Sequence, residues 1–231
     1  MNMAYMIENM AVRKAKQAVG LNDGRARDRL RLDESRVEEI LDIAAEHFIS
    51  QGFEAASISA IAREANASKT TLYSRFPTKE DLFMAVLEMR MNAIFSQVST
   101  TLPVDPPIER TLKDFGLSLL RLAISRDQVA LLRVVSMEST RFPKLAERFY
   151  ELGPKRGLAH LAQYMREQIK RKRLVNENPD TMADHLSSLL TGGPVRWAIL
   201  GMRKNNLDEK TQKERVDACV NVFLRAYSGP R

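Results

Sequence analysis

The amino-acid sequence predicts an all-α fold in two parts: a small N-terminal unit built around a helix–turn–helix, and a larger C-terminal helical domain. Two observations predict this class. Gly and Pro are scarce, at 10 and 9 of 231 residues, so long helices form easily. Apolar residues also recur at helical spacing along most of the chain, in stretches separated by capping residues and prolines.

Composition excludes several classes of protein. The single cysteine, Cys219, rules out an internal disulfide framework and fits a reducing cytoplasm, where we expect the protein to reside. No window holds about 18 consecutive apolar residues, so no membrane span is expected. The N-terminus lacks the apolar core of a signal peptide, so secretion is not expected either.

The charge distribution is uneven along the chain. The formal net charge of +7 suggests a polyanionic partner. Residues 1–80 carry 12 basic and 12 acidic residues, however, so the excess lies entirely C-terminal to them. Residues 66–79 contain Lys69, Arg75 and Lys79 and no acid. Because salt screens charges beyond about 8–10 Å, this local excess decides contact with phosphates.

Residues 1–33 show no sustained period and are rich in Lys and Arg, which predicts a basic, mobile arm with some helix. Two interpretations stay open: a solvated tail, or an arm that supports DNA binding electrostatically. Several methionines precede the basic stretch, so Met10 is a candidate for the true start of the protein.

The first firm helix is expected over residues 36–51. Ser35 and Glu38 have the spacing of a capping box at its start. Gly52 is expected in a left-handed conformation at its end, with Phe53 as the hydrophobic contact that follows.

The next stretch has the spacing of a helix–turn–helix. Ser57 is the expected N-cap of a helix over 58–65, and 66–68 form the turn, in which Asn66 tolerates a left-handed backbone. Ser68 then caps a helix over 69–76.

Pro77 ends that second helix, and Thr78 with Asp81 opens a long helix over 79–100 through a second capping box. The prolines at 103, 106 and 107 are expected to end this helix. The long helix therefore bridges the two predicted parts of the chain.

The helix after the turn has a polar outer face suited to a DNA major groove. Leu72 and Phe76 face back toward Ile61 and Phe48. The side chains left outward or at the edge are Lys69, Thr70, Thr71, Tyr73, Ser74 and Arg75. Lys and Arg bind guanine edges or phosphates, Thr methyl groups contact thymine methyls, and a Tyr hydroxyl donates to phosphate. An ordinary helical hairpin with a solvated polar face is the alternative.

Residues 40–83, ILDIAAEHFISQGFEAASISAIAREANASKTTLYSRFPTKEDLF, resemble the DNA-binding domain of the tetracycline-repressor (TetR) family. The resemblance rests on Gly52-Phe53, Ile61-Ala62, Leu72-Tyr73, Phe76 and Lys79-Glu80-Asp81-Leu82. In two places the chain departs from the family: Asn66-Ala67 stands where Gly-Val is common, and Ala56 where Thr is common.

The resemblance implies a three-helix DNA-binding domain, a dimer formed through the last two helices, and ligand-controlled repression. It places groove contacts on Ser59, Lys69, Thr70, Thr71, Ser74 and Arg75. It places phosphate contacts on Ser57, Tyr73 and Lys79.

The rest of the chain predicts helices only. They are expected over 108–125, 127–140, 143–152, 154–173, 180–202 and 208–227. Gly192-Gly193-Pro194 should kink the penultimate helix or permit close backbone approach. The last two helices carry many apolar residues, among them Leu186, Leu189, Leu190, Val195, Trp197, Leu200, Val216, Val220, Phe223 and Leu224. Such a surface needs an intramolecular cover or a partner, and a two-fold dimer supplies one.

Residues 133–157 and 189–200 resemble the AefR-like C-terminal domain of the same family. This resemblance implies a regulator of efflux or stress genes with a pocket for small, mostly apolar molecules. The residues that would line such a pocket, or would simply form the core, are Phe95, Phe115, Leu119, Met137, Phe142, Phe149 and Met165.

Catalytic patterns are absent from the sequence. His47, His160 and His185 are the only histidines, and His160 shares a helical face with Tyr164 but with no acid or nucleophile. No His, Cys and Asp pattern has metal-ligand spacing, and no Gly-rich phosphate loop or serine elbow is present. We therefore expect neither an enzyme nor a bound cofactor or metal. The dense basic run at 170–173 fits a solvated helix end, with a second DNA site as the alternative.

Together these features predict a basic arm at 1–33, a DNA-binding domain at 34–80 and a ligand-sensing and dimerisation domain at 81–231. The expected function is a dimeric repressor of a palindromic operator, released by a small, mostly apolar effector. Alternatives are a ligand-independent or activating regulator, and a non-specific architectural DNA protein.

Overall fold

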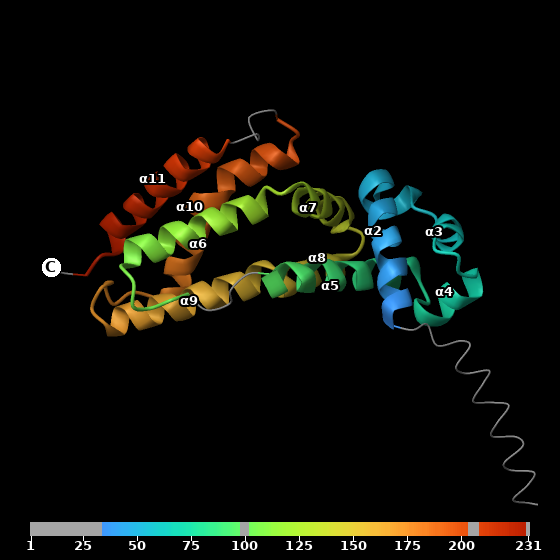
Figure 1. The fold of residues 1–231 in the computed structure, drawn as a ribbon, viewed down its shortest axis with the longest axis horizontal. Coiled ribbons are helices and arrows are strands. Elements are labelled where there is room, and N and C mark those ends of the chain that lie inside the picture. Colours follow the sequence, from blue (N-terminus) through green and yellow to red (C-terminus); the bar gives the residue numbers. More distant parts are fainter. Residues whose placement is uncertain (1–33, 98–101, 203–207, 230–231) are drawn as a thin grey trace, which may run out of the picture.

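The computed structural model describes residues 34–97, 102–202 and 208–229. Within these ranges every regular element is a helix. One isolated antiparallel bridge pairs Leu174, after α9, with Ser228, after α11. The molecule is elongated: α2–α4 form one end, α6 and α9–α11 form the other, and α5, α7 and α8 lie between them (Figure 1). The predicted basic arm at 1–33 lies outside the described residues.

The helices fall close to where the sequence predicts them. Their bounds are α2 Glu34–Ala55, α3 Ile58–Glu64, α4 Lys69–Arg75, α5 Lys79–Gln97, α6 Ile108–Ala123, α7 Arg126–Glu138, α8 Pro143–Leu152, α9 Pro154–Lys170, α10 Pro179–Ile199 and α11 Glu209–Tyr227. The prolines at the starts of α8, α9 and α10 occupy first-turn positions, where a missing N–H costs no helical hydrogen bond. The last residues of the expected 79–100 helix lie outside the described part.

Helix α2 departs from its prediction at both ends. It begins at Glu34, so Ser35 lies inside the first turn and not at the N-cap. Gly52 has the expected positive φ of 81°, but its ψ of 168° lies in a region that only glycine adopts readily, and not in the left-handed helical region. A short helical turn resumes after this bend, and the Ala56 N–H donates to the Gly52 carbonyl at 3.2 Å.

The turn between α3 and α4 is a Schellman motif closed by Asn66, whose φ is 47°. The Ala67 N–H donates to the Ala62 carbonyl at 2.8 Å and the Asn66 N–H to the Arg63 carbonyl at 3.1 Å. Arg36 of α2 reaches across and donates to the carbonyls of Ala65 (2.6 Å) and Asn66. The guanidinium therefore satisfies carbonyls that the end of α3 leaves free.

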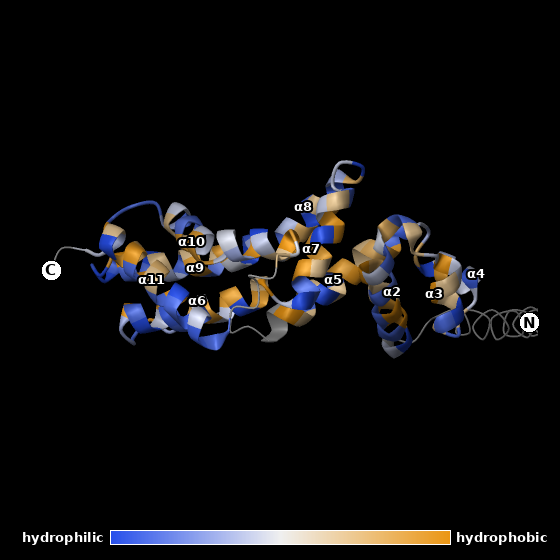
Figure 2. Ribbon diagram, turned by 90° about the horizontal axis from the view of Figure 1, so that it is seen from above, coloured by the Kyte–Doolittle hydropathy of each residue, from blue (hydrophilic) through white to orange (hydrophobic). Residues whose placement is uncertain are grey.

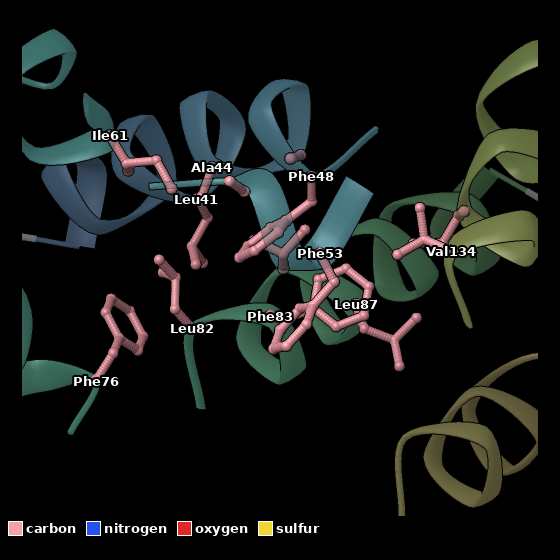
Figure 3. Packing of buried hydrophobic residues seen from close by; sticks show 14 of the residues in the cluster. Leu41, Ala44, Phe48, Phe53, Ile61, Phe76, Leu82, Phe83, Leu87 and Val134 are labelled. Carbon is pink, nitrogen blue, oxygen red and sulfur yellow. The ribbon is translucent and has the colours of Figure 1, made fainter. Parts of the chain in front are cut away.

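The first hydrophobic core joins helices α2–α4 to the central helices. Phe48 and Phe53 pack on Phe83 of α5, with ring centroids 4.8 and 5.5 Å away (Figure 3). Phe142, at the α7–α8 corner, adds an edge-on contact to Phe53 at 5.2 Å. Buried residues of α7 and α8 such as Val134 belong to the same core. The core thus extends across the domain boundary that the sequence predicts near residue 80.

The second core lies at the other end of the molecule, between α6, α9, α10 and α11. Gly116 permits close approach there, because a Cβ at this position would lie 3.0 Å from Val216 and 3.1 Å from Leu190. Hydrophilic and hydrophobic residues alternate along α6 and α11 (Figure 2), and the hydrophobic residues of α6, α9, α10 and α11 that belong to this core are buried. Leu186, Leu190, Val216, Val220 and Phe223 are therefore covered within the chain.

Helix α10 runs from Pro179 to Ile199, through the Gly192-Gly193-Pro194 stretch where the sequence predicts a kink or a close backbone approach. Pro194 has no N–H, so the Leu190 carbonyl loses its helical partner. Arg215 of α11 replaces that partner: its Nε donates to the Leu190 carbonyl at 3.1 Å and its Nη2 to the Leu189 carbonyl at 2.9 Å. The structure does not show the close backbone approach that the sequence predicts here: a Cβ at Gly193 would meet only side chains at ordinary contact distance, with Arg215 Nη2 at 3.5 Å, and a Cβ at Gly192 would meet no atom within 4 Å.

The basic run at 170–173 has a structural role that the sequence reading missed. Arg171 pairs with Asp105 at 2.9 Å, and Arg173 donates to the Val104 carbonyl at 3.0 Å. Lys170 pairs with Glu167 on its own helix. The two arginines therefore hold the segment before α6 against the end of α9.

The backbone at residue 52 gives the first testable prediction. Gly52→Ala should lower the free energy of unfolding by about 1–3 kcal/mol, because an L residue is strained at this φ and ψ. Gly157→Ala is the matched control: it lies inside α9, where a Cβ meets no atom within 4 Å, so it should be neutral or stabilising. Urea unfolding measures both, and equal stability of the two variants would contradict the assigned strain.

Candidate nucleic-acid interface

Helix α4 is fixed on its inner face and open on its outer face. Leu72 and Phe76 are buried in the first core with Ile61 and Phe48, as the sequence predicts. The Ser68 hydroxyl caps the helix by accepting from the Thr71 N–H at 3.0 Å. Helices α3 and α4 lie at the extreme end of the molecule, far from α10 and α11 (Figure 1). The outer face of α4 is therefore free to meet a partner along the long axis of the molecule.

Four of the predicted contact residues present unengaged side chains. Lys69, Thr70, Tyr73 and Arg75 are exposed, and make no side-chain hydrogen bond or ion pair with other described residues. Two cations and an aromatic hydroxyl on one short helix supply donors for guanine edges and phosphates. No acidic side chain lies on α4 to oppose them.

Of the Ser and Thr residues predicted to contact DNA, some already make hydrogen bonds within the protein and others do not. Thr71 is half-buried and its hydroxyl lies 2.7 Å from that of Ser68, so it belongs to the cap. Ser74 donates to the Thr71 carbonyl of its own helix at 2.8 Å. Ser57 and Ser59 are exposed at the start of α3, and the Ser57 hydroxyl makes no capping bond.

Lys79 is half-buried and binds within the domain. Its Nζ donates to the Glu54 carbonyl at 2.8 Å and lies 4.8 Å from the centroid of the Phe53 ring. Because an ammonium group carries three N–H donors, Lys79 still has donors left for a phosphate. Its first role is to hold the start of α5 against the bend after Gly52.

The start of α5 is capped as the sequence predicts. The Thr78 N–H donates to Asp81 Oδ2 at 3.0 Å, and the Asp81 N–H donates to Thr78 Oγ1 at 3.1 Å. This reciprocal cap fixes the short connection between α4 and α5. The orientation of α4 is thus set by capped turns on both sides.

Two of the three histidines make polar contacts between helices. His47 Nε2 lies 2.8 Å from Glu64, and its Nδ1 is 3.0 Å from Gln51, so it links α2 to α3. His185 Nδ1 lies 2.6 Å from the Tyr227 hydroxyl. In the described ranges no three His, Cys, Asp or Glu side chains are grouped to hold a metal ion. None of the helices described there is long and apolar enough to cross a membrane.

A cavity of about 300 Å³ lies between the two cores. Helices α5 to α10 all contribute to its wall. Its lining is Met91, Ile94, Phe115, Ser118, Leu119, Leu122, Ala123, Gln128, Leu132, Phe149, Gly153, Pro154, Gly157, Leu158, Leu161, Ser187, Thr191 and Val195.

Three of the predicted pocket residues, Phe115, Leu119 and Phe149, line this cavity. The others do not. Met137 is 77% exposed, Met165 is buried in the second core, and Phe142 packs on Phe53. The side chain of Phe95 lies outside the described part. Apolar spacing marks which residues face inward, but it carries no signal for which of them border an empty space.

A short helix, a tight turn and a second helix with a basic, exposed outer face define a helix–turn–helix DNA-binding protein. The family model described as bacterial regulatory proteins, tetR family, matches residues 40–86, and that of the AefR-like transcriptional repressor C-terminal domain matches residues 110–229. The chain belongs to the TetR family of transcriptional regulators.

Solved structures of this family share the fold. The flavonoid-responsive regulator FrrA is 32% identical, with 86% of this chain and all of that one covered and a TM-score of 0.75. A TetR-family regulator from Mesorhizobium loti is 27% identical over 84% of this chain and 97% of its own, with a TM-score of 0.77. The transcriptional activator FasR of Mycolicibacterium smegmatis is 36% identical over 97 residues, which span 42% of this chain and 43% of FasR.

The open side chains of α4 give the second prediction. Arg75→Ala and Lys69→Ala should each relax base preference at one position of the bound sequence, at a cost of about 1–3 kcal/mol in binding. Tyr73→Phe should instead weaken binding about equally across sequences. Binding selection from a randomised DNA pool measures both effects.

Arg110→Ala is the control for charge, since it removes one exposed cation from α6, in the other half of the molecule. It should leave base preference unchanged. Unchanged preference in both α4 alanine variants would refute the choice of base readers.

Proposed function

We propose that this protein is a dimeric repressor that binds a palindromic operator and is released from it by a small, mostly apolar molecule. The observation that carries the proposal is the outer face of α4, where Lys69, Tyr73 and Arg75 are exposed and unengaged. The match to the AefR-like repressor domain supports the repressor sense. The similarity to the activator FasR favours the alternative, an activator built on the same scaffold.

The dimer is proposed to form through the outer faces of α10 and α11. Leu189 of α10, Leu200 just after it and Val222 of α11 are 38%, 67% and 52% exposed, and a partner chain at this surface would cover them. Half of the apolar residues that the sequence predicts for the dimer surface are buried within the chain. The proposed dimer contact therefore uses fewer apolar residues than the sequence suggests. A two-fold axis there would place two α4 helices on successive major grooves, about 34–36 Å apart.

The cavity is the proposed effector site. Its wall is mainly aliphatic and aromatic, which suits an apolar ligand. FrrA, which responds to flavonoids, supports a ligand of aromatic character.

The proposed signal runs through helices that touch both the cavity and the DNA-binding unit. In α7, Leu132 lines the cavity, while Leu131, Val134 and Val135 lie in the first core with residues of α2. Phe149 of α8 and Met91 of α5 belong to both. A ligand that binds one arrangement of these helices better than another would shift the spacing of the two α4 helices by population shift.

Competition binding tests the proposed function. At physiological salt, DNA from upstream of the protein's own gene should bind at least about 10³-fold more tightly than random DNA of equal length. The expected stoichiometry is an even number of chains per palindrome. Equal affinity for both DNAs would identify a non-specific architectural protein and overturn the repressor proposal.

Filling the cavity tests the effector site. Gly157 lines the cavity with open space around it, so Gly157→Leu should occupy the ligand's volume without disturbing α9. The neutral probe N-phenyl-1-naphthylamine should fluoresce with wild type and with Gly157→Ala, and should bind Gly157→Leu about tenfold more weakly or worse. Operator affinity in the absence of ligand should be the same for all three. Unchanged probe binding by Gly157→Leu would place the effector site elsewhere.

A further inference from the structure

The cavity wall has no ionisable side chain among its described residues, and this restricts the charge of the ligand. The polar members of the wall are Ser118, Gln128, Ser187 and Thr191. A carboxylate or ammonium group placed there would lose its water without gaining a counter-ion, which is strongly unfavourable. The wall therefore selects neutral molecules.

One polar atom of this wall stands apart from the rest. The side-chain carbonyl oxygen of Gln128 is buried and has no hydrogen-bond donor within the described chain. By contrast, Thr191 donates its hydroxyl to the Ser187 carbonyl at 2.8 Å, and Ser118 donates to the Asp114 carbonyl at 3.0 Å. A buried acceptor without a partner has lost its hydrogen bond to water, so it favours a ligand that supplies a donor.

Gln128 lies in the first turn of α7, where the Ser125 side chain caps the helix by accepting from the Gln128 N–H at 3.4 Å. Its backbone is thereby fixed, and Leu132, one turn later, also lines the cavity. A donor that meets Gln128 would bind directly to the helix whose later turns pack in the first core with α2.

We infer that the effector is a neutral, apolar molecule with a hydroxyl group, and that this hydroxyl donates to the side-chain carbonyl of Gln128. The inference rests on the proposed effector site and adds to it a ligand class and a specificity-determining residue. A hydroxyl also accepts hydrogen bonds, so it can pair with either the carbonyl oxygen or the NH₂ group of the Gln128 side chain. The apolar body of the ligand then lies along the wall of α6 and α9.

Three probes of one shape separate the contributions: 4-phenylphenol, 4-methylbiphenyl, in which a methyl replaces the hydroxyl, and 4-phenylbenzoate, which carries a negative charge. Each displaces N-phenyl-1-naphthylamine from wild type, from Gln128→Met and from Thr191→Val, with the affinity of the fluorescent probe measured for every variant. Gln128→Met keeps the length of the side chain and removes its carbonyl. Thr191→Val is the matched control, because it removes a hydroxyl that already has a partner. Thermal unfolding verifies that both variants are folded.

The phenol-to-methyl affinity ratio should fall about tenfold in Gln128→Met relative to wild type and stay unchanged in Thr191→Val. The carboxylate should bind at least about tenfold more weakly than the phenol. An unchanged ratio in Gln128→Met, with both neutral probes still bound, would overturn the role of Gln128 and leave the proposed effector site standing. Equal binding of the carboxylate would overturn the neutral class. Failure of all three probes to displace the fluorophore would overturn the inference, while operator binding would still decide the proposed function.

Discussion

The contact between Phe53 and the aromatic rings around it is the constraint on which the rest of the structure depends. Phe53 follows the bend at Gly52 and meets Phe48 from its own helix, Phe83 from α5 and Phe142 from the α7–α8 corner. Such ring pairs add stabilisation beyond their buried area. Lys79 covers the same ring, and an ion pair between Glu54 and Arg141 lies beside it. The DNA-binding unit is therefore packed directly against the helices of the cavity, and is not merely tethered to them through α5.

The sequence predicts the helices well because their signals are local, and it predicts the contacts between helices less well because those join distant residues. Caps such as Ser68 and the Thr78–Asp81 pair act over three residues, so they are visible in the chain. Asn66 likewise has the expected positive φ, because the turn itself requires it. The contacts of Phe142, Arg36 and Arg215 join residues far apart in the sequence, and periodicity carries no record of such partners.

The same limit applies to the candidate sites. The face of α4 was predictable, since it is what remains after Leu72 and Phe76 turn inward. That the Thr71 hydroxyl belongs to the Ser68 cap depends on side-chain geometry. The cavity is harder to predict from the sequence, because it is a space that the side chains of several helices leave unfilled. Gly157 lines it without a side chain, and a Cβ there would meet no atom within 4 Å. At Gly192-Gly193-Pro194 the sequence predicted a kink or a close backbone approach, but Arg215 supplies the donor that Pro194 lacks and the helix continues to Ile199.

The sign of regulation does not follow from the fold itself. The cavity and the first core share Met91 and Phe149, so a ligand in the cavity would contact residues of both. Tight binding alone shifts nothing; only a difference in affinity between two arrangements does. A ligand that prefers the arrangement with correctly spaced α4 helices makes an activator of DNA binding, and one that prefers the other makes an inducer. In the proposed mechanism Gln128 and Leu132 would connect the ligand to α7, so the position of that helix in the two arrangements would decide between them.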